Sequence, residues 1–330
     1  MIMKAAWIEE FGAAGQVFKI GEQTKPSPQA GEVLVRLKTS CVNPSDVKKR
    51  AGAFNNLLDD GLVIPHSDGA GIIEAVGIGV DSARIGQRVF VYQAQYHRHL
   101  GTAAQYVCVN EKRAPVLPEQ ASFQVGACLG IPVMTAHRCV FADGDVSGQT
   151  ILITGGAGRV GYYAIQWAKF AGATVIATAS NARDEQACRQ AGAQHVVNHR
   201  ENNWGARVLL INGGERVQRV IDVEFGANLP QVLQCIDTGG TIATYSSNQV
   251  SEPSLPFRDM MFMDLTIRMI LVYAMPEVAK QQAIKDTQTL LAQGGLQHRV
   301  GAIMSIENIA HAHQLVEAGD VRGCVVLDIE

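Results

Sequence analysis

A glycine-rich turn between a strand-like run and a helical pattern is the feature that most constrains the fold of this chain. Residues 151–161 read ILITGGAGRVG, and the glycines match the spacing G-x-G-x-x-G. The run before the turn is apolar and β-branched, as in a buried parallel strand, and residues 162–172 carry apolar groups at helical spacing and end on glycine. This order is typical of a dinucleotide-binding unit, in which N–H groups at the helix start bind a pyrophosphate; the alternative is a glycine turn without a ligand. We assign to the cofactor the turn residues Gly155, Gly156, Ala157, Gly158, Arg159 and Val160.

The end of the next strand-like run indicates which dinucleotide binds. Residues 174–179 read TVIATA, and a site for NAD usually places Asp or Glu directly after such a strand to bond the ribose hydroxyls. This chain has Ser180, Asn181 and Arg183 there, which can donate to a 2′-phosphate that a carboxylate would repel. Alternatively, Ser180 and Asn181 cap the helix that follows, and both roles can coexist. The residues favour NADPH as the cofactor.

Length and composition predict an α/β protein of two domains. A chain of 330 residues, 47% of them hydrophobic, is long for a single core. Up to about residue 123, short runs broken by glycine and proline predict antiparallel strands, and beyond it alternating strand and helix patterns predict a doubly wound parallel sheet. We expect one domain over residues 1–123 and 276–330, and a nucleotide-binding domain over residues 124–275.

Charge and hydropathy narrow the classes of partner. The net charge of −3, with no basic run, gives no reason to expect a nucleic-acid partner. No apolar stretch has the length of a membrane span, and the N-terminus lacks a charged leader with a cleavage site, so we expect no membrane association and a cytoplasmic location. An odd number of scattered cysteines suits a reducing compartment, and we expect most of them to be buried and inert. The seven cysteines are Cys41, Cys108, Cys128, Cys139, Cys188, Cys235 and Cys324.

Metal ligands are not recognisable in the sequence. No lobe of four closely spaced cysteines occurs, and we assign no metal-binding residue. The pairs His97 with His99 and His311 with His313 have the spacing of metal ligands, but their polar surroundings predict surface histidines. We expect the carboxylate of Asp68 to hold the backbone of a turn rather than to act as an acid or base.

Five ordered segments carry a family resemblance. They are CVNPSD at 41–46, PHSDGAGIIEAVG at 65–77, GIPVMTAHR at 130–138, GGAGRVG at 155–161 and NHREN at 198–202. Together they resemble the zinc-independent quinone oxidoreductases, the zeta-crystallin-like branch of the medium-chain dehydrogenase/reductase superfamily. The resemblance implies a GroES-like, mainly antiparallel catalytic domain, a Rossmann domain with a parallel sheet, NADPH between them, and a homodimer.

The resemblance also implies roles for individual residues. Asn43 matches the family's asparagine beside the nicotinamide, Thr135 a threonine near the cofactor, and His199 a residue that reaches the adenosine phosphate. Ser67 stands where zinc-binding relatives have a histidine ligand, which speaks against catalytic zinc. Lys48 stands where the family commonly has an aromatic residue; it could bond a quinone oxygen or a cofactor ribose, or lie on a solvated helix face.

Independently of the resemblance, Tyr245 and Ser246 follow a strand-like run at 239–244, where ligands bind parallel sheets; plain loop polarity is the alternative.

Without a metal to polarise a carbonyl, the chemistry needs an acceptor that is already electrophilic. A quinone meets this need, and we expect an NADPH-dependent, metal-free quinone reductase with Asn43 and Lys48 as catalytic residues. An alternative is an NADPH-dependent enone or enoyl thioester reductase, for which Tyr92 or Tyr96 would be the proton donor. A third alternative is a binding or structural protein that holds NADPH.

A strand-like run near the end of the second domain predicts the homodimer. Residues 265–273 read LTIRMILVY and carry a single charge, Arg268. An exposed sheet edge of this composition would be a template for aggregation, so pairing with its copy across a two-fold axis is the expected remedy.

Overall fold

The computed structural model describes residues 1–329 and divides them into two compact units. Unit 1 comprises residues 1–131 and 284–330 of the chain, and unit 2 comprises residues 132–283. The division thus falls several residues beyond the expected positions 123 and 275. Its first crossing lies after the first residue of helix α4 (Ile131–Phe141), and its second lies inside helix α10 (Glu277–Ala292).

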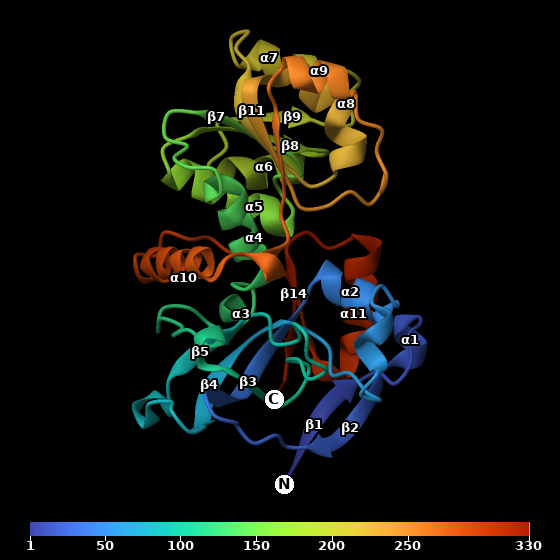
Figure 1. Ribbon diagram of the computed structural model, residues 1–330, viewed down its shortest axis with the longest axis vertical. Helices are drawn as coiled ribbons and strands as arrows, with labels where there is room; N and C mark the ends of the chain where they lie inside the picture. Colours follow the sequence, from blue (N-terminus) through green and yellow to red (C-terminus); the bar gives the residue numbers. More distant parts are fainter. Residues whose placement is uncertain (330) are drawn as a thin grey trace. The chain divides into compact units, whose positions relative to one another are not determined.

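Unit 1 is built on a mainly antiparallel sheet (Figure 1). Its strands run in the order β13-β14-β3-β4-β5, with β6 also paired to β3. Every pair is antiparallel except β13 with β14. These strands are β3 (Glu32–Val42), β4 (Asp68–Val76), β5 (Arg88–Val91), β6 (Tyr106–Asn110), β13 (Val300–Ser305) and β14 (Cys324–Asp328).

Short helices and a hairpin complete unit 1. The hairpin pairs β1 (Ile2–Trp7) with β2 (Lys19–Thr24). Helix α11 (Ile309–Ala318) contacts both α1 (Ala14–Val17) and α2 (Pro44–Arg50), and the three lie together in Figure 1. Short 3-10 turns lie at 55–58, 82–84, 111–113 and 306–308. The apolar faces of the strands form the core, which includes Val33, Val35, Val89, Val107 and Val325.

Unit 2 is a doubly wound parallel sheet. Within the described residues its strand order is β12-β11-β10-β7-β8-β9, and all neighbours are parallel. Counted along the chain from β7, this is the order 3-2-1-4-5-6 of dinucleotide-binding sheets. The strands are β7 (Thr150–Ile153), β8 (Thr174–Ala179), β9 (His195–Asn198), β10 (Val217–Asp222), β11 (Ile236–Thr244) and β12 (Thr266–Met269). The expected fold class, a GroES-like domain plus a Rossmann domain, is confirmed.

Helices connect the strands of unit 2, as right-handed crossovers between parallel strands require. All these strands run in the same direction, so their carboxyl ends lie at one edge of the sheet. The loops that follow β7, β8, β10 and β11 at this edge can hold a ligand. The helices are α4 (Ile131–Phe141), α5 (Arg159–Phe170), α6 (Ala182–Ala191), α7 (Trp204–Ile211), α8 (Phe225–Cys235) and α9 (Phe257–Phe262), followed by a 3-10 turn at 272–274.

The helical segment that follows residue 122 is broken. Helix α3 (Phe123–Gly126) ends before Gly130, and α4 begins at Ile131. A Cβ at Gly130 would lie 2.1 Å from Oδ1 of Asp68, so the chain needs glycine where it passes this carboxyl group. The break therefore leaves room for the side chain of Asp68.

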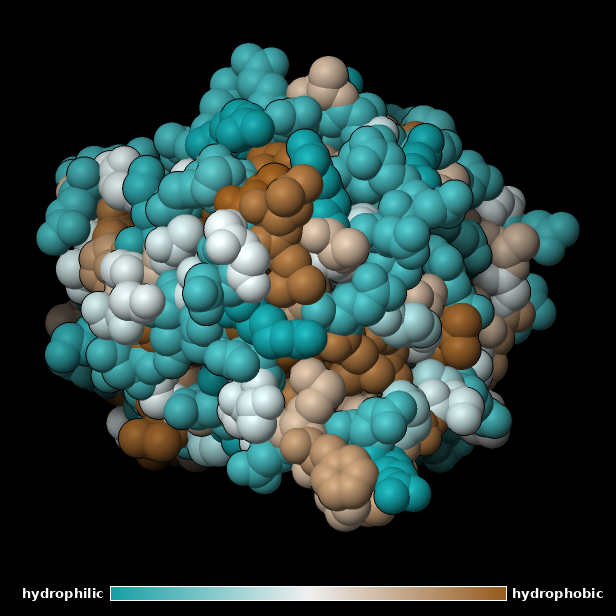
Figure 2. Space-filling view, turned by 90° about the horizontal axis from the view of Figure 1, so that it is seen from above, coloured by the Kyte–Doolittle hydropathy of each residue, from teal (hydrophilic) through white to brown (hydrophobic). Residues whose placement is uncertain are grey.

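The strand expected over residues 265–273 is shorter, because only 266–269 pair with the sheet. It is nevertheless an edge strand, as expected. The side chains of Met269 and Leu271 are 74% and 60% exposed, and Phe257 and Phe262 of α9 are 74% and 68% exposed. Seen from the end of the molecule that carries α7 and α9, apolar patches interrupt the hydrophilic surface (Figure 2).

Among the residues that the structure describes, no helix is both long enough and apolar enough to cross a bilayer.

Candidate functional site

The glycine turn of unit 2 leaves the start of a helix open to a ligand. Gly155 has φ +61°, its N–H donates to Thr178 Oγ1 at 2.9 Å, and Gly158 precedes α5. A Cβ at Gly161 would lie 2.4 Å from the carbonyl oxygen of Gly155, so close packing of helix on strand requires glycine there. Within the described chain no side chain caps α5, and the start of a helix is a place where N–H groups can bind an anion. That this turn binds a pyrophosphate stays a prediction.

The end of β8 gathers the residues expected near the adenosine ribose. His199 is exposed, and its backbone N–H donates to Ala179 O at 3.2 Å, which places it beside Ser180. Arg183 is exposed and Ser180 half-buried. Asn181 caps α6, since its Oδ1 accepts from Asp184 N at 2.9 Å and its Nδ2 donates to the carboxylate of Asp184 at 2.9 Å. The capping alternative therefore holds for Asn181, while Ser180, Arg183 and His199 remain predicted phosphate contacts.

A buried acid at the switch point between β7 and β10 was not expected. Asp222 Oδ1 accepts hydrogen bonds from Thr154 Oγ1 at 2.5 Å and Asn228 Nδ2 at 2.7 Å. Burial raises the pKa of Asp222, against the effect of these hydrogen bonds. Its Oδ2 is buried and has no hydrogen-bond partner among the described residues, so it is open to a donor at the crevice. A polar residue ending a strand-like run is the sequence signal that could have found it.

Tyr245 and Ser246 lie in the same crevice region. The N–H of Tyr245 donates to Asp222 O at 3.3 Å, and Ser246 O accepts from Phe225 N at 3.0 Å. Burial raises the pKa of Tyr245 well above its usual range, with Cys139 and Asp222 adding to the effect. The residue as a whole is half-buried.

Thr135 belongs to the same unit and is 5% exposed on α4. Its proximity to the cofactor stays a prediction.

In unit 1 the start of α2 holds the other predicted site residues. The side chain of Asp46 accepts from the N–H of Asn43 at 2.8 Å, which fixes the helix start, with Pro44 in its first turn. Asn43 Nδ2 donates to Asp68 Oδ2 at 2.9 Å, and the same oxygen accepts from Ile131 N at 2.7 Å. Asp68 therefore holds backbone, as expected, and also orients Asn43. Burial raises the pKa of Asp68 well above its usual range.

The lysine that faces this cluster is Lys49, not Lys48. Lys48 is exposed on α2, whereas Lys49 is 7% exposed. Its ammonium lies 3.3 Å from Ser67 Oγ, 3.3 Å from Gln95 Oε1 and 4.0 Å from Asp46 Oδ1. Burial lowers the pKa of Lys49, and the negative charges of Asp46 and Asp68 oppose that shift. The prediction of a catalytic Lys48 has no support from its position on the helix.

His66 and His313 form a buried pair behind the cluster. Their Nε2 atoms are 2.9 Å apart, and His66 Nδ1 lies 2.8 Å from Ser40 Oγ. Burial lowers the pKa of His66 to about 3 and that of His313 well below its usual value. The prediction that His313 is a surface histidine is wrong, because α11 turns it into the unit against Phe18, with ring centroids 4.7 Å apart. His311, two residues before it, is exposed.

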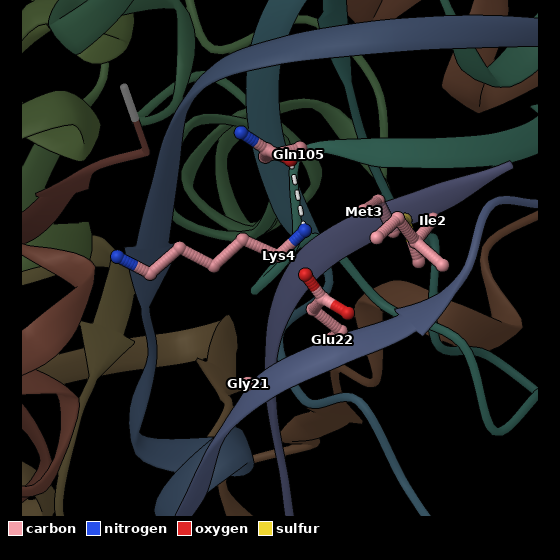
Figure 3. Close-up of a pocket in the computed structure, with 6 residues that line it drawn as sticks. All are labelled: Ile2, Met3, Lys4, Gly21, Glu22 and Gln105. Atoms are coloured by element: carbon pink, nitrogen blue, oxygen red, sulfur yellow. Dashed lines mark hydrogen bonds between the residues drawn. The ribbon is translucent and has the colours of Figure 1, made fainter.

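One cavity of unit 1 lies away from these residues. It has a volume of about 350 Å³ between β1 and β2 and is lined by Lys4, Gly21, Glu22 and Gln105 with Ile2 and Met3 (Figure 3). The dashed bond in Figure 3 joins Lys4 N to Gln105 Oε1 at 2.8 Å. A second cavity, of about 310 Å³, lies in unit 2 beside α8. Neither contains a predicted site residue, and both have too few convergent polar groups to compete with the glycine turn.

Family models cover both units of the chain. Residues 29–119 match the alcohol dehydrogenase GroES-like domain, and residues 160–293 match the zinc-binding dehydrogenase family. The chain belongs to the medium-chain dehydrogenase/reductase superfamily. It is 28% identical over 331 residues to a human quinone oxidoreductase, covering 99% of this chain and 98% of the relative.

Solved structures show the same architecture over the whole length. A mycobacterial protein complexed with NADPH is 25% identical, with a TM-score of 0.87 over 99% of this chain and 100% of that chain. A quinone oxidoreductase from Coxiella burnetii is 26% identical, with a TM-score of 0.83 over 100% of both chains. The chain is thus an oxidoreductase of this superfamily, and its relatives act on or bind small molecules.

The residues of this chain do not fit the catalytic zinc of zinc-binding members. The expected histidine ligand is replaced by Ser67, and the ammonium of Lys49 lies 3.3 Å from the Ser67 hydroxyl. A cation at that place would be repelled by the ammonium, and a serine hydroxyl is not among the usual zinc ligands. The residues of unit 2, in contrast, fit a dinucleotide, because the glycine turn and the uncapped start of α5 offer a pyrophosphate N–H donors.

Proposed function

We propose that this protein is an NADPH-dependent reductase of quinones that works without a catalytic metal. The observation that carries the proposal is the buried ammonium of Lys49 beside Ser67, where a metal would otherwise polarise the substrate. Lys49 provides a fixed positive charge and N–H donors for an oxygen that gains negative charge. Identity to quinone oxidoreductases over almost the full length supports the substrate class.

NADPH supplies the hydride when it is bound. We propose that Gly155, Gly156, Ala157, Gly158, Arg159 and Val160 hold its pyrophosphate and that Ser180, Arg183 and His199 contact its 2′-phosphate. We include Asn181 among the proposed cofactor-binding residues because it lies at the start of α6, next to Ser180. Thr135, Tyr245 and Ser246 would line the route toward the nicotinamide, and the absence of a carboxylate after β8 supports NADPH over NADH.

The residues of unit 1 bind and protonate the substrate in this proposal. Asp68 keeps the Asn43 amide in place through the 2.9 Å bond, and the Oδ1 of Asn43 has no partner among the residues that the structure describes. Lys49 donates to the quinone oxygen that becomes a phenolate and then gives it a proton. Gln95 and Ser67 hold the ammonium in position.

Assembly and location complete the proposal. The exposed apolar side chains of β12 and α9 support a homodimer formed through the β12 edge. The free state of all seven cysteines is compatible with the cytoplasm. The weakly acidic net charge of −3 favours a small-molecule substrate over a nucleic acid.

A substrate panel tests the function directly. Quinones, enones and enoyl thioesters are compared under steady-state conditions with NADPH. We expect quinones to give the highest kcat/KM; preference for an enone or enoyl thioester would replace the proposal with double-bond reduction, for which the buried Tyr92 and half-buried Tyr96 remain proton-donor candidates. NADPH binding without turnover of any substrate would leave the binding-protein alternative.

Paired lysine variants test the role of Lys49. Lys49→Met removes the charge and keeps the length of the side chain, and Lys48→Met makes the same change on the exposed side of α2. A charge-assisted hydrogen bond contributes about 1.5–3 kcal/mol, so Lys49→Met should lower kcat/KM for the best quinone by about ten- to a hundredfold. Lys48→Met should change it by less than about twofold. Equal effects of the two substitutions would overturn the mechanism.

A further inference from the structure

Three cysteines from distant parts of the chain meet inside unit 1. Cys41 lies on β3, Cys128 lies between α3 and α4, and Cys324 begins β14. Their sulfur atoms all lie within 4.8 Å of one another, and the residues are 0–1% exposed. The cluster lies apart from the proposed reacting groups but on the same elements, since Cys41 and Asn43 are two residues apart.

The surroundings of the cluster give the thiols few hydrogen bonds outside it. Ala127 and Val326 pack against it. Cys128 Sγ donates to Gln124 O at 3.2 Å, and Cys41 Sγ lies 4.0 Å from Val42 O. The seven cysteines, all within the described residues, are free thiols. The pKa of Cys41 is raised well above its usual value, first by hydrogen bonds from the other two thiols and then by burial. The three sulfur atoms are therefore close neighbours of one another in a mainly apolar surrounding.

We propose that Cys41, Cys128 and Cys324, whose sulfur atoms lie within 4.8 Å of one another, form a structural site for a thiophilic d10 metal ion. Three thiolates suit Cu(I), and Zn(II) would need a fourth ligand beside them. Tetrahedral zinc with Zn–S bonds of about 2.3 Å sets its sulfur atoms about 3.8 Å apart, so two sulfur atoms at the upper limit of 4.8 Å would approach each other by about 1 Å on binding. On binding, each thiol releases its proton to solvent, and no atom changes oxidation state.

Charge at the site is compatible with this assignment. Three thiolates and Zn(II) leave one negative charge, and three thiolates and Cu(I) leave two. Burial raises the pKa of the neighbouring Asp68, which disfavours its charged form. The metal would tie β3, β14 and the α3–α4 break together, and these are the elements that hold Asn43 and Asp68. Its expected effect is a more stable unit 1, with no part in the reaction.

Metal titration of the full chain tests the site. Reduced apoprotein is titrated under argon with Cd²⁺, whose ultraviolet thiolate charge-transfer band reports sulfur ligation, and then with Zn²⁺ and Cu(I). We expect one equivalent to bind per chain and to raise the melting temperature. Cys324→Ala should weaken binding by about a hundredfold or more, whereas Cys139→Ala, which removes a fully buried thiol of unit 2, should leave it unchanged.

Further outcomes decide the assignment. Cys128→Ala gives a second test of the thiol set if the Cys324 variant does not fold. No charge-transfer band in folded wild-type protein, or equal binding by the Cys324→Ala and Cys139→Ala variants, would overturn the proposal and leave three cysteines packed as small apolar side chains.

Discussion

The buried histidine pair makes acid stability a sharp test of the structure of unit 1. A carbonyl oxygen can only accept a hydrogen bond, so the hydroxyl of Thr102 donates to Asp68 O at 2.7 Å. The Oγ1 of Thr102 therefore accepts from Ser40 Oγ, which lies 2.7 Å away. Ser40 therefore accepts from His66 Nδ1–H, and the bare Nε2 of His66 accepts from His313 Nε2–H. Both rings are neutral in this network. Among the described residues His313 Nδ1 has no hydrogen-bond partner, which agrees with the assigned tautomers.

The sign and size of the effect follow from the lowered pKa of His313. In the unfolded chain this histidine takes up a proton below pH 6.5, its ordinary pKa, whereas in the folded protein it stays neutral. The unfolded state then binds more protons, so the free energy of unfolding falls as the pH falls. Integrated from pH 6.5 to about pH 4.5, one such group removes about 2.3 kcal/mol.

The substitution His313→Gln isolates this contribution. Glutamine can still donate to His66 Nε2 but does not titrate, and it loses the edge contact with Phe18, which lowers stability at every pH. His311→Gln is the matched control on the exposed side of α11.

Urea unfolding of wild type and both variants at about pH 6.5, 5.5 and 4.5 gives the comparison. The stability of wild type relative to His313→Gln should fall by about 2 kcal/mol over this range. A constant difference would refute the buried neutral pair, as would a similar pH dependence in the His311→Gln comparison.

Three more predictions concern the turn, the edge strand and the lysine. Gly161→Ala places a Cβ 2.4 Å from a carbonyl oxygen, and should weaken NADPH binding by at least about tenfold in a fluorescence titration, whereas Gly15→Ala, with its nearest neighbour at 3.7 Å, should not. Met269→Lys should convert a dimer to monomer in light scattering, whereas Val278→Lys, at a 79% exposed position, should not; a monomeric wild type would contradict the assembly. The pH profile of kcat/KM should fall on the alkaline side at a pKa below 10.5, because protonated Lys49 is required, and this limb should vanish in Lys49→Met.

A substitution at Ile270 is not suitable for testing the dimer contact at the β12 edge. Its N–H donates to Thr244 O at 2.7 Å, inside the sheet, so proline there would break unit 2 itself. Met269 and Leu271 alternate with it along the strand and are the residues that face outward.

Local patterns predicted the Rossmann unit well, because each signal there acts over a few residues. Strand β8 spans residues 174–179, the run read from the sequence, and the glycine turn follows β7 directly. The break at Gly130 was not predictable in this way. The break is required by the carboxyl group of Asp68, which is distant from Gly130 in the sequence. No residue near Gly130 in the sequence indicates that contact.

The choice between Lys48 and Lys49 depends on helix phase. Successive residues of a helix point about 100° apart, so only one of two neighbouring lysines can face the cluster. The inward face of α2 carries Asp46, Val47, Lys49 and Arg50, and this spacing was present in the sequence as a usable signal.

The clusters of residues from distant parts of the chain could not be predicted from local sequence patterns. Cys41, Cys128 and Cys324, like His66 and His313, come together only when the sheet of unit 1 pairs β14 with β3 and α11 packs beside it. No spacing along the chain encodes such contacts, and a histidine on a helix with polar neighbours looks like a surface residue until the partner helix is placed.

Cofactor choice tests the account most directly. Isothermal titration of the wild-type protein with NADPH and with NADH, in the same buffer and at the same salt concentration, measures both dissociation constants. With Ser180, Arg183 and His199 at the end of β8 and β9, and no carboxylate directly after β8, NADPH should bind about ten- to a hundredfold more tightly. Equal affinities, or tighter binding of NADH, would contradict the proposed site and the reductase built on it.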